Sequence, residues 1–302
     1  MKKTIVLGAV TALVSIALAG CASGNPLAAS TSAAPAGGTI IVGSADFTES
    51  QLIAEIYAQA LQGKGVKVKQ QPNIGSREVY MAALKDGSIN LVPEYNGALM
   101  SYLDPKATES TTASVNAKLR TVLPAGTTML NSSAATDTDV LAVTQATADK
   151  YHLKTIGDLK PIAGTLTLGG PPEWKTRVLG VVGLQQRYGL NFKQFLSLDA
   201  GGPLTMTALT TNQVQVGDIF STDPQFVANH LVALKDTKSL FAAENVVPVI
   251  AKSALTPVVK ATLNAVSAKL TTADLIEMNG EAGKGTNLAT IATQWLTKVN
   301  LK

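Results

Sequence analysis

The sequence has few of the residues that covalent cross-links and metal sites need: one cysteine and two histidines among 302 residues. A single cysteine forms no intrachain disulfide, so stability must come from burial, for which a chain that is 46% hydrophobic has enough material. His152 and His230 lack the spacing of a metal site. Neither a Gly-x-Ser-x-Gly elbow nor a Gly-x-x-x-x-Gly-Lys loop is present. We therefore expect no metal, no cofactor and no catalytic residue.

Charged residues are also sparse, at 15% of the chain with a net charge of +4. Lys64, Lys67 and Lys69 alternate along an expected strand and indicate a solvated face rather than a basic patch. No other Lys/Arg cluster stands out, which argues against a nucleic-acid partner. After the N-terminal segment no apolar run reaches the ~20 residues that a membrane-spanning helix needs. Any membrane contact is therefore expected at the N-terminus.

The N-terminal segment has the layout of a secretory signal: Lys2 and Lys3, an apolar stretch over 5–18, and then Leu18-Ala19-Gly20-Cys21. A cysteine directly after Leu-Ala-Gly is typical of a bacterial lipoprotein, in which the thiol is acylated before cleavage. An ordinary signal peptide, or one membrane helix that happens to contain a cysteine, is the alternative. We predict a signal peptide over 1–20 and lipid on Cys21. The mature protein would then lie on the extracytoplasmic face of the cell membrane, held by several acyl chains.

Residues 21–38 are mostly Ala, Ser, Thr, Pro and Gly. Such a segment cannot bury enough apolar surface to offset its ordering entropy, so we predict a flexible tether. The first β-branched run, Thr39 to Gly43, marks the start of the folded part.

Strand and helix patterns then alternate to the end of the chain, which favours an α/β fold with ligand sites at the carboxyl ends of strands. Together with the predicted export, this rhythm is typical of the two-lobed ligand-binding subunits of importers, which close on a solute by hinge motion. The expected strands are 39–43, 66–68, 89–92, 140–143, 165–168, 214–220, 231–234 and 246–250; the expected helices are 48–63, 76–85, 113–123, 173–188, 204–210, 223–229, 256–270, 272–278 and 288–299.

Short motifs along the whole chain from Ile40 resemble those of osmoprotectant-binding proteins, the ABC-importer components for glycine betaine, carnitine and choline. In family order they are Val42 to Ser50, Asn73 to Ser76, Ala82 to Gly87, Leu91 to Gly97, Thr155 to Leu159, Pro172 to Arg177, Tyr188 to Leu190 and Phe220 to Asp223. The resemblance implies a type II periplasmic-binding fold, with a mixed, mostly parallel sheet flanked by helices in each lobe and two hinge crossings. Lobe 1 would comprise 39–138 and 246–302, and lobe 2 would comprise 139–245.

The resemblance also implies the kind of ligand. A quaternary ammonium head is held by aromatic faces, and its carboxylate by N–H groups, hydroxyls or an arginine. Here Val92, Asp139 and Glu244 stand where the family often has tyrosine. Two carboxylates in place of tyrosines favour a solute with hydrogen-bond donors, such as hydroxyls or a protonated amine.

The candidate ligand-binding residues come from the motifs and from these departures. They are Phe47, Ser76, Tyr95, Asn96, Asp139, Trp174, Arg177, Phe220, Ser221, Thr222 and Glu244. Each has a structural alternative. Phe47 and Trp174 could be core residues, Ser76 could cap a helix, Asn96 could shape a turn, and Arg177 could pair with an acidic neighbour.

The expected partners are a small-molecule solute, a membrane permease and the membrane itself through Cys21, with the protein acting as a monomer. Two alternatives stay open. The same fold could present a solute to a sensor, or a pair of acids such as Asp139 and Glu244 could perform glycosidase chemistry.

Overall fold

The computed structural model describes residues 38–302. The predicted signal peptide, Cys21 and nearly all of the predicted tether lie outside the described residues. Within them, no helix has both the length and the apolar character needed to cross a bilayer.

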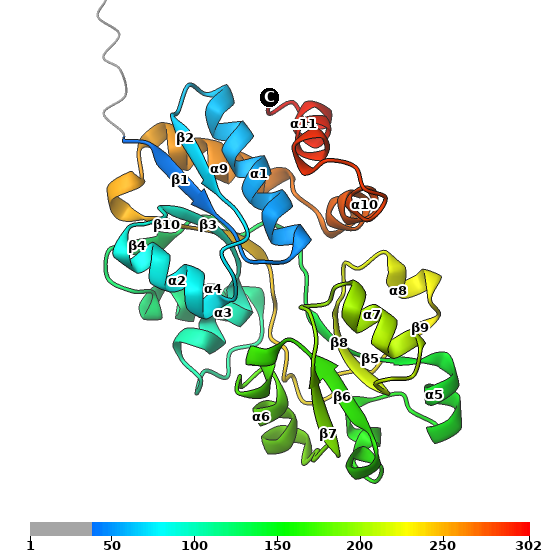
Figure 1. Ribbon diagram of the computed structural model, residues 1–302. Helices are drawn as coiled ribbons and strands as arrows, with labels where there is room; N and C mark the ends of the chain where they lie inside the picture. Colours follow the sequence, from blue (N-terminus) through cyan, green and yellow to red (C-terminus); the bar gives the residue numbers. More distant parts are fainter. Residues whose placement is uncertain (1–37) are drawn as a thin grey trace, which may run out of the picture. The chain divides into compact units, whose positions relative to one another are not determined.

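The first lobe contains a five-stranded sheet in the order β2-β1-β3-β10-β4 (Figure 1). Neighbours β1, β2 and β3 are parallel, whereas β10 runs antiparallel to both β3 and β4. The strands are β1 (Ile40–Gly43), β2 (Val68–Gln71), β3 (Leu91–Tyr95), β4 (Thr127–Met129) and β10 (Val246–Ala251). One strand therefore opposes four that share a direction.

Helices cover both faces of this sheet and bury its apolar side chains. Helix α1 shows why: Leu52, Ile53, Ile56 and Tyr57 recur at helical spacing and are all buried. One face is covered by α1 (Thr48–Gly63), α9 (Pro257–Lys269), α10 (Thr272–Gly283) and α11 (Leu288–Lys298), and the other by α2 (Arg77–Asp86), α3 (Asn96–Leu103) and α4 (Thr112–Val122).

The second lobe repeats the pattern with the order β7-β6-β8-β5-β9. Here β5 is the strand that opposes its neighbours β8 and β9. The strands are β5 (Asp139–Thr144), β6 (Thr167–Gly170), β7 (Gln194–Ser197), β8 (Val216–Phe220) and β9 (Leu231–Ala233). The helices are α5 (Gln145–Tyr151), α6 (Val181–Gly183), α7 (Pro203–Thr210) and α8 (Gln225–Ala228), with short turns η1 (Ile156–Leu159), η2 (Ala163–Thr165), η3 (Pro172–Lys175) and η4 (Leu184–Tyr188); η5 (Lys252–Ala254) belongs to the first lobe.

The chain passes between the lobes twice, before β5 and before β10. The two crossing segments pair with each other through an antiparallel bridge between Thr136 and Asn245. Two mixed, mostly parallel sheets joined by a paired double crossing confirm the predicted fold class.

Several local expectations are wrong. The helix expected over 173–188 is broken into η3, α6 and η4. The break falls at Gly180, where a Cβ would lie 2.0 Å from the carbonyl oxygen of Trp174. Strand β3 does not end at Pro93 but continues to Tyr95. The partner of Pro93 in β10 is Pro248, so neither residue needs an N–H for this ladder position.

Candidate solute-binding pocket between the lobes

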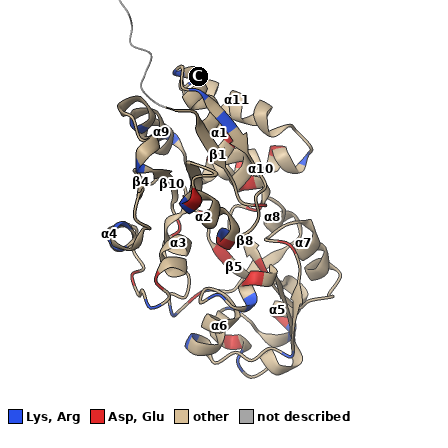
Figure 2. Cartoon of the chain, turned by 60° about the vertical axis from the view of Figure 1, so that its left-hand side comes forward, with Lys and Arg blue, Asp and Glu red and all other residues tan. Residues whose placement is uncertain are grey.

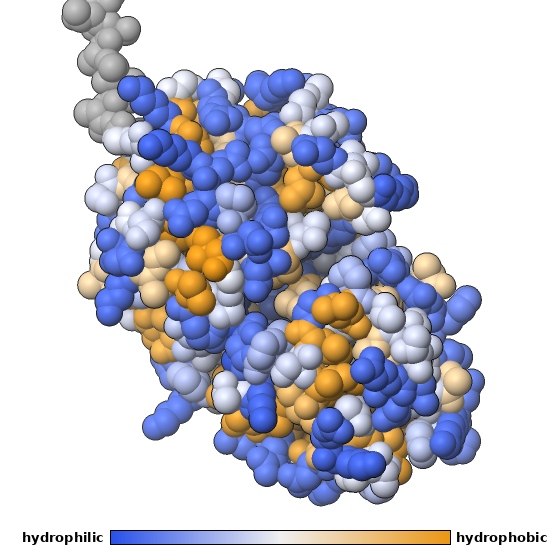
Figure 3. Space-filling model, in the orientation of Figure 1, coloured by the Kyte–Doolittle hydropathy of each residue, from blue (hydrophilic) through white to orange (hydrophobic). Residues whose placement is uncertain are grey.

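A pocket lies where the two lobes face each other, with about 580 Å³ of empty space that includes the part open to solvent. Figure 3 shows the hollow between the two parts of the surface. We call it the cleft pocket. Its lining comes from strand ends, helix starts and both crossings: Ala45, Asp46, Phe47, Ser76, Arg77, Tyr80, Tyr95, Ala98, Asp137, Asp139, Pro171, Glu173, Trp174, Arg177, Ala200, Phe220 and Glu244. Parallel strands end at one edge of a sheet, which is why segments distant in sequence meet here.

Aromatic side chains from both lobes form one wall of the cleft pocket. Phe47 follows β1, and its ring centroid lies 6.0 Å from that of Tyr95 and 5.1 Å from that of Phe220. Phe220 in turn rests on Gly201, where φ is +62° and a Cβ would lie 2.7 Å from the Phe220 ring. Glycine is therefore required at this turn both by conformation and by the close approach. Trp174 completes the aromatic lining and is 1% exposed.

Acidic residues are the second main group in the site. Figure 2 shows red segments, which mark Asp and Glu, near β5 and β8. Asp137, Asp139 and Glu244 line the cleft pocket, and Asp218 lies behind it on β8 with 1% exposure. Burial, reinforced by the charge of Asp139, raises the pKa of Glu244 well above its usual range. Burial and the charges of Asp139 and Glu244 do the same to the pKa of Asp218.

The pKa values of the other two acids, Asp137 and Asp139, are also raised. Burial and then the charge of Glu49 raise the pKa of Asp137, although hydrogen bonds from Thr222 oppose the rise. Burial also raises the pKa of Asp139, an effect that the charge of Arg177 opposes. Four mutually repelling carboxyls cannot all carry full charge in this space, so the cluster binds protons when no cation is near.

Arg77 faces the cleft pocket but is held by a partner of its own. Its guanidinium donates two hydrogen bonds, each 2.9 Å long, to the carboxylate of Glu94, which is fully buried. The Tyr80 hydroxyl and the Tyr95 backbone N–H donate to the same carboxylate. Burial lowers the pKa of Arg77, but the opposing charge of Glu94 dominates and the pKa lies above its ordinary value. The charges of Arg77 and Glu94 therefore neutralise each other in the pocket wall, and hydrogen bonds from Tyr80 and Tyr95 hold the Glu94 carboxylate in place.

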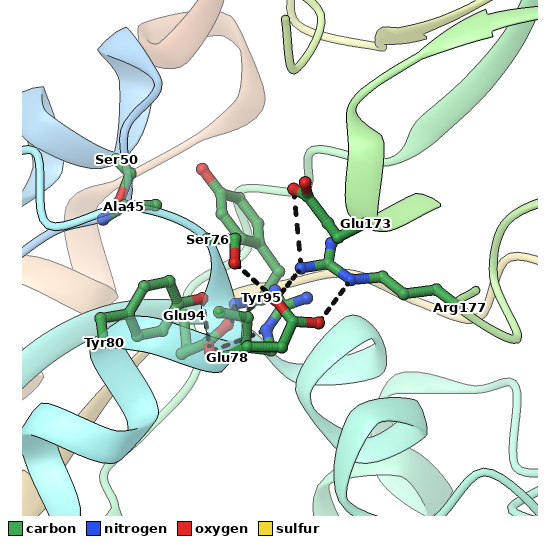
Figure 4. Close-up of polar contacts among 10 residues, drawn as sticks. Ala45, Ser50, Ser76, Glu78, Tyr80, Glu94, Tyr95, Glu173 and Arg177 are labelled. Atoms are coloured by element: carbon green, nitrogen blue, oxygen red, sulfur yellow. Dashed lines mark hydrogen bonds and ion pairs between the residues drawn. The ribbon is translucent and has the colours of Figure 1, made fainter. Parts of the chain in front are cut away.

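Two sets of contacts join the lobes on either side of the pocket. On one side, Arg177 from the second lobe donates to both Glu78 oxygens of the first, at 3.1 and 2.8 Å (Figure 4). On the other side, Glu49 accepts hydrogen bonds of 2.6 Å from Tyr95, Thr222 and Asn279. Since Thr222 belongs to the second lobe, the structure shows the lobes in contact across the cleft.

A second cavity adjoins the cleft pocket along Asp46, Phe47, Glu173 and Phe220, which line both. It encloses about 1380 Å³ of space, again partly open to solvent, and continues past Glu49 and Thr222 to α7 and α10. This adjoining cavity gives the cleft pocket a route toward the surface.

The structure brings together most of the residues that the sequence predicted. The cleft pocket is lined by Phe47, Ser76, Tyr95, Asp139, Trp174, Arg177, Phe220 and Glu244, and Thr222 lines the adjoining cavity. Asn96 and Ser221 do not line either one. Asn96 is fully buried, where its oxygen accepts from the N–H groups of Gly97 and Asn245. Ser221 donates to Asp137 at the hinge.

Three important residues were missed by sequence reasoning: Arg77, Asp137 and Glu49. Arg77 directly follows the predicted Ser76, and Asp137 precedes the predicted Asp139 by two positions, so proximity to a motif was the available signal. Glu49 lies inside the first motif as well. Only the fold shows that Glu49 meets Thr222 and Asn279, which are 173 and 230 positions away.

The fold and its pocket define a class: a two-lobed solute-binding protein of the periplasmic-binding type. Residues 38–298 match the family model for the substrate-binding domain of ABC-type glycine betaine transport systems, and the chain belongs to that family. No group of three or more His, Cys, Asp or Glu arranged to hold a metal is found among the described residues.

Named relatives agree with this assignment. The carnitine transport binding protein OpuCC of Listeria monocytogenes is 29% identical over 272 residues, which cover 87% of each chain. A glycine-betaine-binding protein of Pseudomonas aeruginosa is 27% identical over 72% of this chain and 73% of its own. The solved structure of a glycine betaine/carnitine/choline ABC transporter is 27% identical with a TM-score of 0.68, covering 87% of this chain and 99% of its own.

Proposed function

We propose that this protein is the extracytoplasmic solute-binding subunit of an ABC importer and that it captures a small polar solute in the cleft pocket. The observation that carries the proposal is the pocket itself, to which both lobes contribute aromatic and ionisable side chains. A solute bound there contacts both lobes at once and stabilises their closed arrangement by its preference for that state. The closed form then delivers the solute to a membrane permease.

The roles of the lining residues follow from their chemistry. Phe47, Tyr95, Phe220 and Trp174 offer apolar faces, and Asp139 and Glu244 offer acceptors. Ser76 lies at the start of α2, where the helix presents unpaired N–H groups. We propose that these residues bind the solute without changing it chemically and that the protein releases it intact.

The first test is a thermal-shift screen of the soluble chain from Ala22, followed by calorimetry. Betaine, choline, carnitine, proline, ectoine, polyols, sugars, amines and aromatic metabolites form the panel. A true solute raises the melting temperature with concentration, because it binds the folded state alone. Phe220→Ala should weaken the binding of that solute at least tenfold, while Leu204→Ala, at a position 63% exposed on α7, leaves it unchanged. A panel without a single stabilising solute contradicts the proposal.

Attachment to the membrane is proposed to run through lipid on Cys21, with the protein acting as a monomer. Cys21→Ser should move the protein from the detergent-rich to the aqueous phase of a two-phase extraction without changing its solute affinity. If the serine variant partitions like the unaltered chain, another segment anchors it.

A further inference from the structure

We propose that the solute has a cationic centre with N–H donors, and that Asp139 and Glu244 accept those hydrogens. The class comprises primary to tertiary ammonium, guanidinium and amidinium compounds and excludes fully methylated quaternary ammonium. This inference rests on the proposed function, since it concerns the ligand of the same cleft pocket.

The pocket carboxyls have no cation of their own. Across residues 38–302, no lysine or arginine forms an ion pair with Asp137, Asp139, Asp218 or Glu244. The two arginines in the lining are already occupied: Arg77 by Glu94, and Arg177 by Glu78 with Glu173 at 3.7 Å. These four carboxyls therefore have no ion-pair partner within the described chain, and the charges of Arg77 and Arg177 act on Asp139 and Glu244 only from beyond ion-pair distance.

Asp137 accepts hydrogen bonds from Ser221 and Thr222, but Glu244 and Asp139 are poorly supplied with donors. Glu244 is 4% exposed, lines the cleft pocket, and has a buried Oε1 without a partner in the described chain. Asp139 is half-buried at the start of β5, and the only hydrogen-bond donor that acts on its carboxyl within residues 38–302 is the Trp174 indole, which opposes the rise of its pKa. The Trp174 indole N–H has no other partner within the described chain. Burying a carboxylate without hydrogen-bond donors costs free energy, so a ligand that brings donors into the pocket would be stabilised by these acids.

Two properties of the partner follow. A carboxylate only accepts hydrogen bonds, so it needs N–H or O–H donors, which a quaternary ammonium group does not have. A neutral polyol provides donors but leaves the charge of the cluster unbalanced, whereas an N–H cation provides both. A charge-assisted hydrogen bond to a carboxylate is also about twice as strong as a neutral one. The aromatic wall of Phe47, Tyr95 and Phe220 can then pack against the carbon skeleton.

The test uses two matched series that differ only in N-methylation, with affinities measured by calorimetry. One runs from choline through dimethyl- and monomethylethanolamine to ethanolamine, and the other from glycine betaine through dimethylglycine and sarcosine to glycine. Agmatine and putrescine are added as larger N–H cations. We expect the best N–H compound to bind at least tenfold more tightly than either quaternary compound.

Variants then assign the acceptors. Glu244→Gln and Asp139→Asn should each lower the affinity for the N–H compound at least tenfold. Glu277→Gln, at an exposed position on α10, should leave that affinity unchanged. Asp139→Tyr should move the preference toward the quaternary members. The comparison within the unaltered protein does not depend on whether any variant folds.

Each outcome separates this inference from the proposed function. Equal or tighter binding of choline or glycine betaine overturns the inference while supporting a solute-binding role. Binding of a neutral solute alone does the same. Absence of binding by every compound, including those of the broad screen, overturns both.

Discussion

At the residue scale, Glu49 holds together three segments that the sequence keeps far apart. Its carboxylate accepts from the Tyr95 hydroxyl on one oxygen and from Thr222 and Asn279 on the other. The Tyr95 hydroxyl is thereby committed to the protein, and only the tyrosine ring is available to the cleft pocket. Tyr95 also belongs to the core of the first lobe, so truncating it to alanine would remove core packing together with any ligand contact.

Tyr95→Phe separates these two roles. Loss of a hydrogen bond to a charged group should lower the free energy of unfolding by about 1.5–3 kcal/mol. Solute affinity should change by less than about threefold, because the ring stays. Denaturant unfolding and calorimetry measure the two quantities. Tyr102→Phe, on the exposed side of α3, is the matched control and should alter neither. A large loss of affinity without loss of stability would place the hydroxyl on the solute instead.

At the element scale, the contact between helix α2 and the segment after η3 connects the lobes through side chains at the pocket rim. Arg177 and Glu78 meet there with bidentate geometry, although the Glu78 side chain is 42% exposed. Burial raises the pKa of Glu78, but hydrogen bonds from Arg177 and Ser76 outweigh it and bring the pKa to about 2. A depressed pKa means that the contact persists above the ordinary glutamate range and is lost only as the pH falls toward about 2.

Arg177→Lys should loosen this contact, since lysine cannot form the paired hydrogen bonds. Exposed ion pairs contribute about 0.2–1 kcal/mol, so solute dissociation should become roughly 1.5–5-fold faster. Stopped-flow fluorescence measures the dissociation rate. Glu78→Gln should have a similar effect, and the double variant should add little to either single change. Fully additive effects would show that the two side chains act independently. Glu281→Gln, which removes an exposed pair on α10, serves as the control.

At the scale of the whole molecule, the acids around the cleft make the stability of the free protein depend on pH. The pKa values of Asp137, Asp139, Asp218 and Glu244 are all raised by burial in the folded state. The folded protein therefore binds more protons than the unfolded chain between their unfolded and folded pKa values, and its stability falls as the pH rises through that window. Surface acids such as Asp104 and Asp158 have lowered pKa values in the folded protein. Their contribution to the stability of the protein is lost only when the pH falls below about 4, the ordinary pKa range of aspartate.

The melting temperature of the free protein should accordingly rise when the pH is lowered from about 8 to about 5, and then fall below about 4. Asp218→Asn should raise the melting temperature at neutral pH and flatten the upper part of the profile, because Asp218 is buried and unpaired. A profile that declines steadily from pH 8 to pH 5 would show that the cluster is ionised and compensated. A cationic solute binds the deprotonated acids, so in its presence the melting temperature should fall, rather than rise, as the pH is lowered.

The pattern of apolar residues was enough to predict the fold class and most of the regular elements. Helix α1 was predicted over Thr48 to Gly63, as observed, because its buried face repeats with helical spacing. Helices α3 and α5 and strands β4 and β7 were not predicted. All four are short, and α3 is apolar on most sides, so none has a period that local sequence can reveal. The interrupted segment between η3 and η4 escaped prediction because packing against Gly180, not local propensity, sets its course.

By itself, the sequence determined the alternation of strands and helices, the order of the family motifs and eight of the residues that line the cleft pocket. These properties are local: they depend on periodicity, on turn chemistry and on which strand end carries which side chain. Tertiary structure alone decided the pairing of Arg77 with Glu94, the junction of Glu49 with Thr222 and Asn279, and the lack of an ion pair to Asp139, Asp218 or Glu244 in the described chain. The reason is physical. Whether a charge is satisfied depends on which groups reach it through space and on how much water is excluded, and no local pattern encodes either.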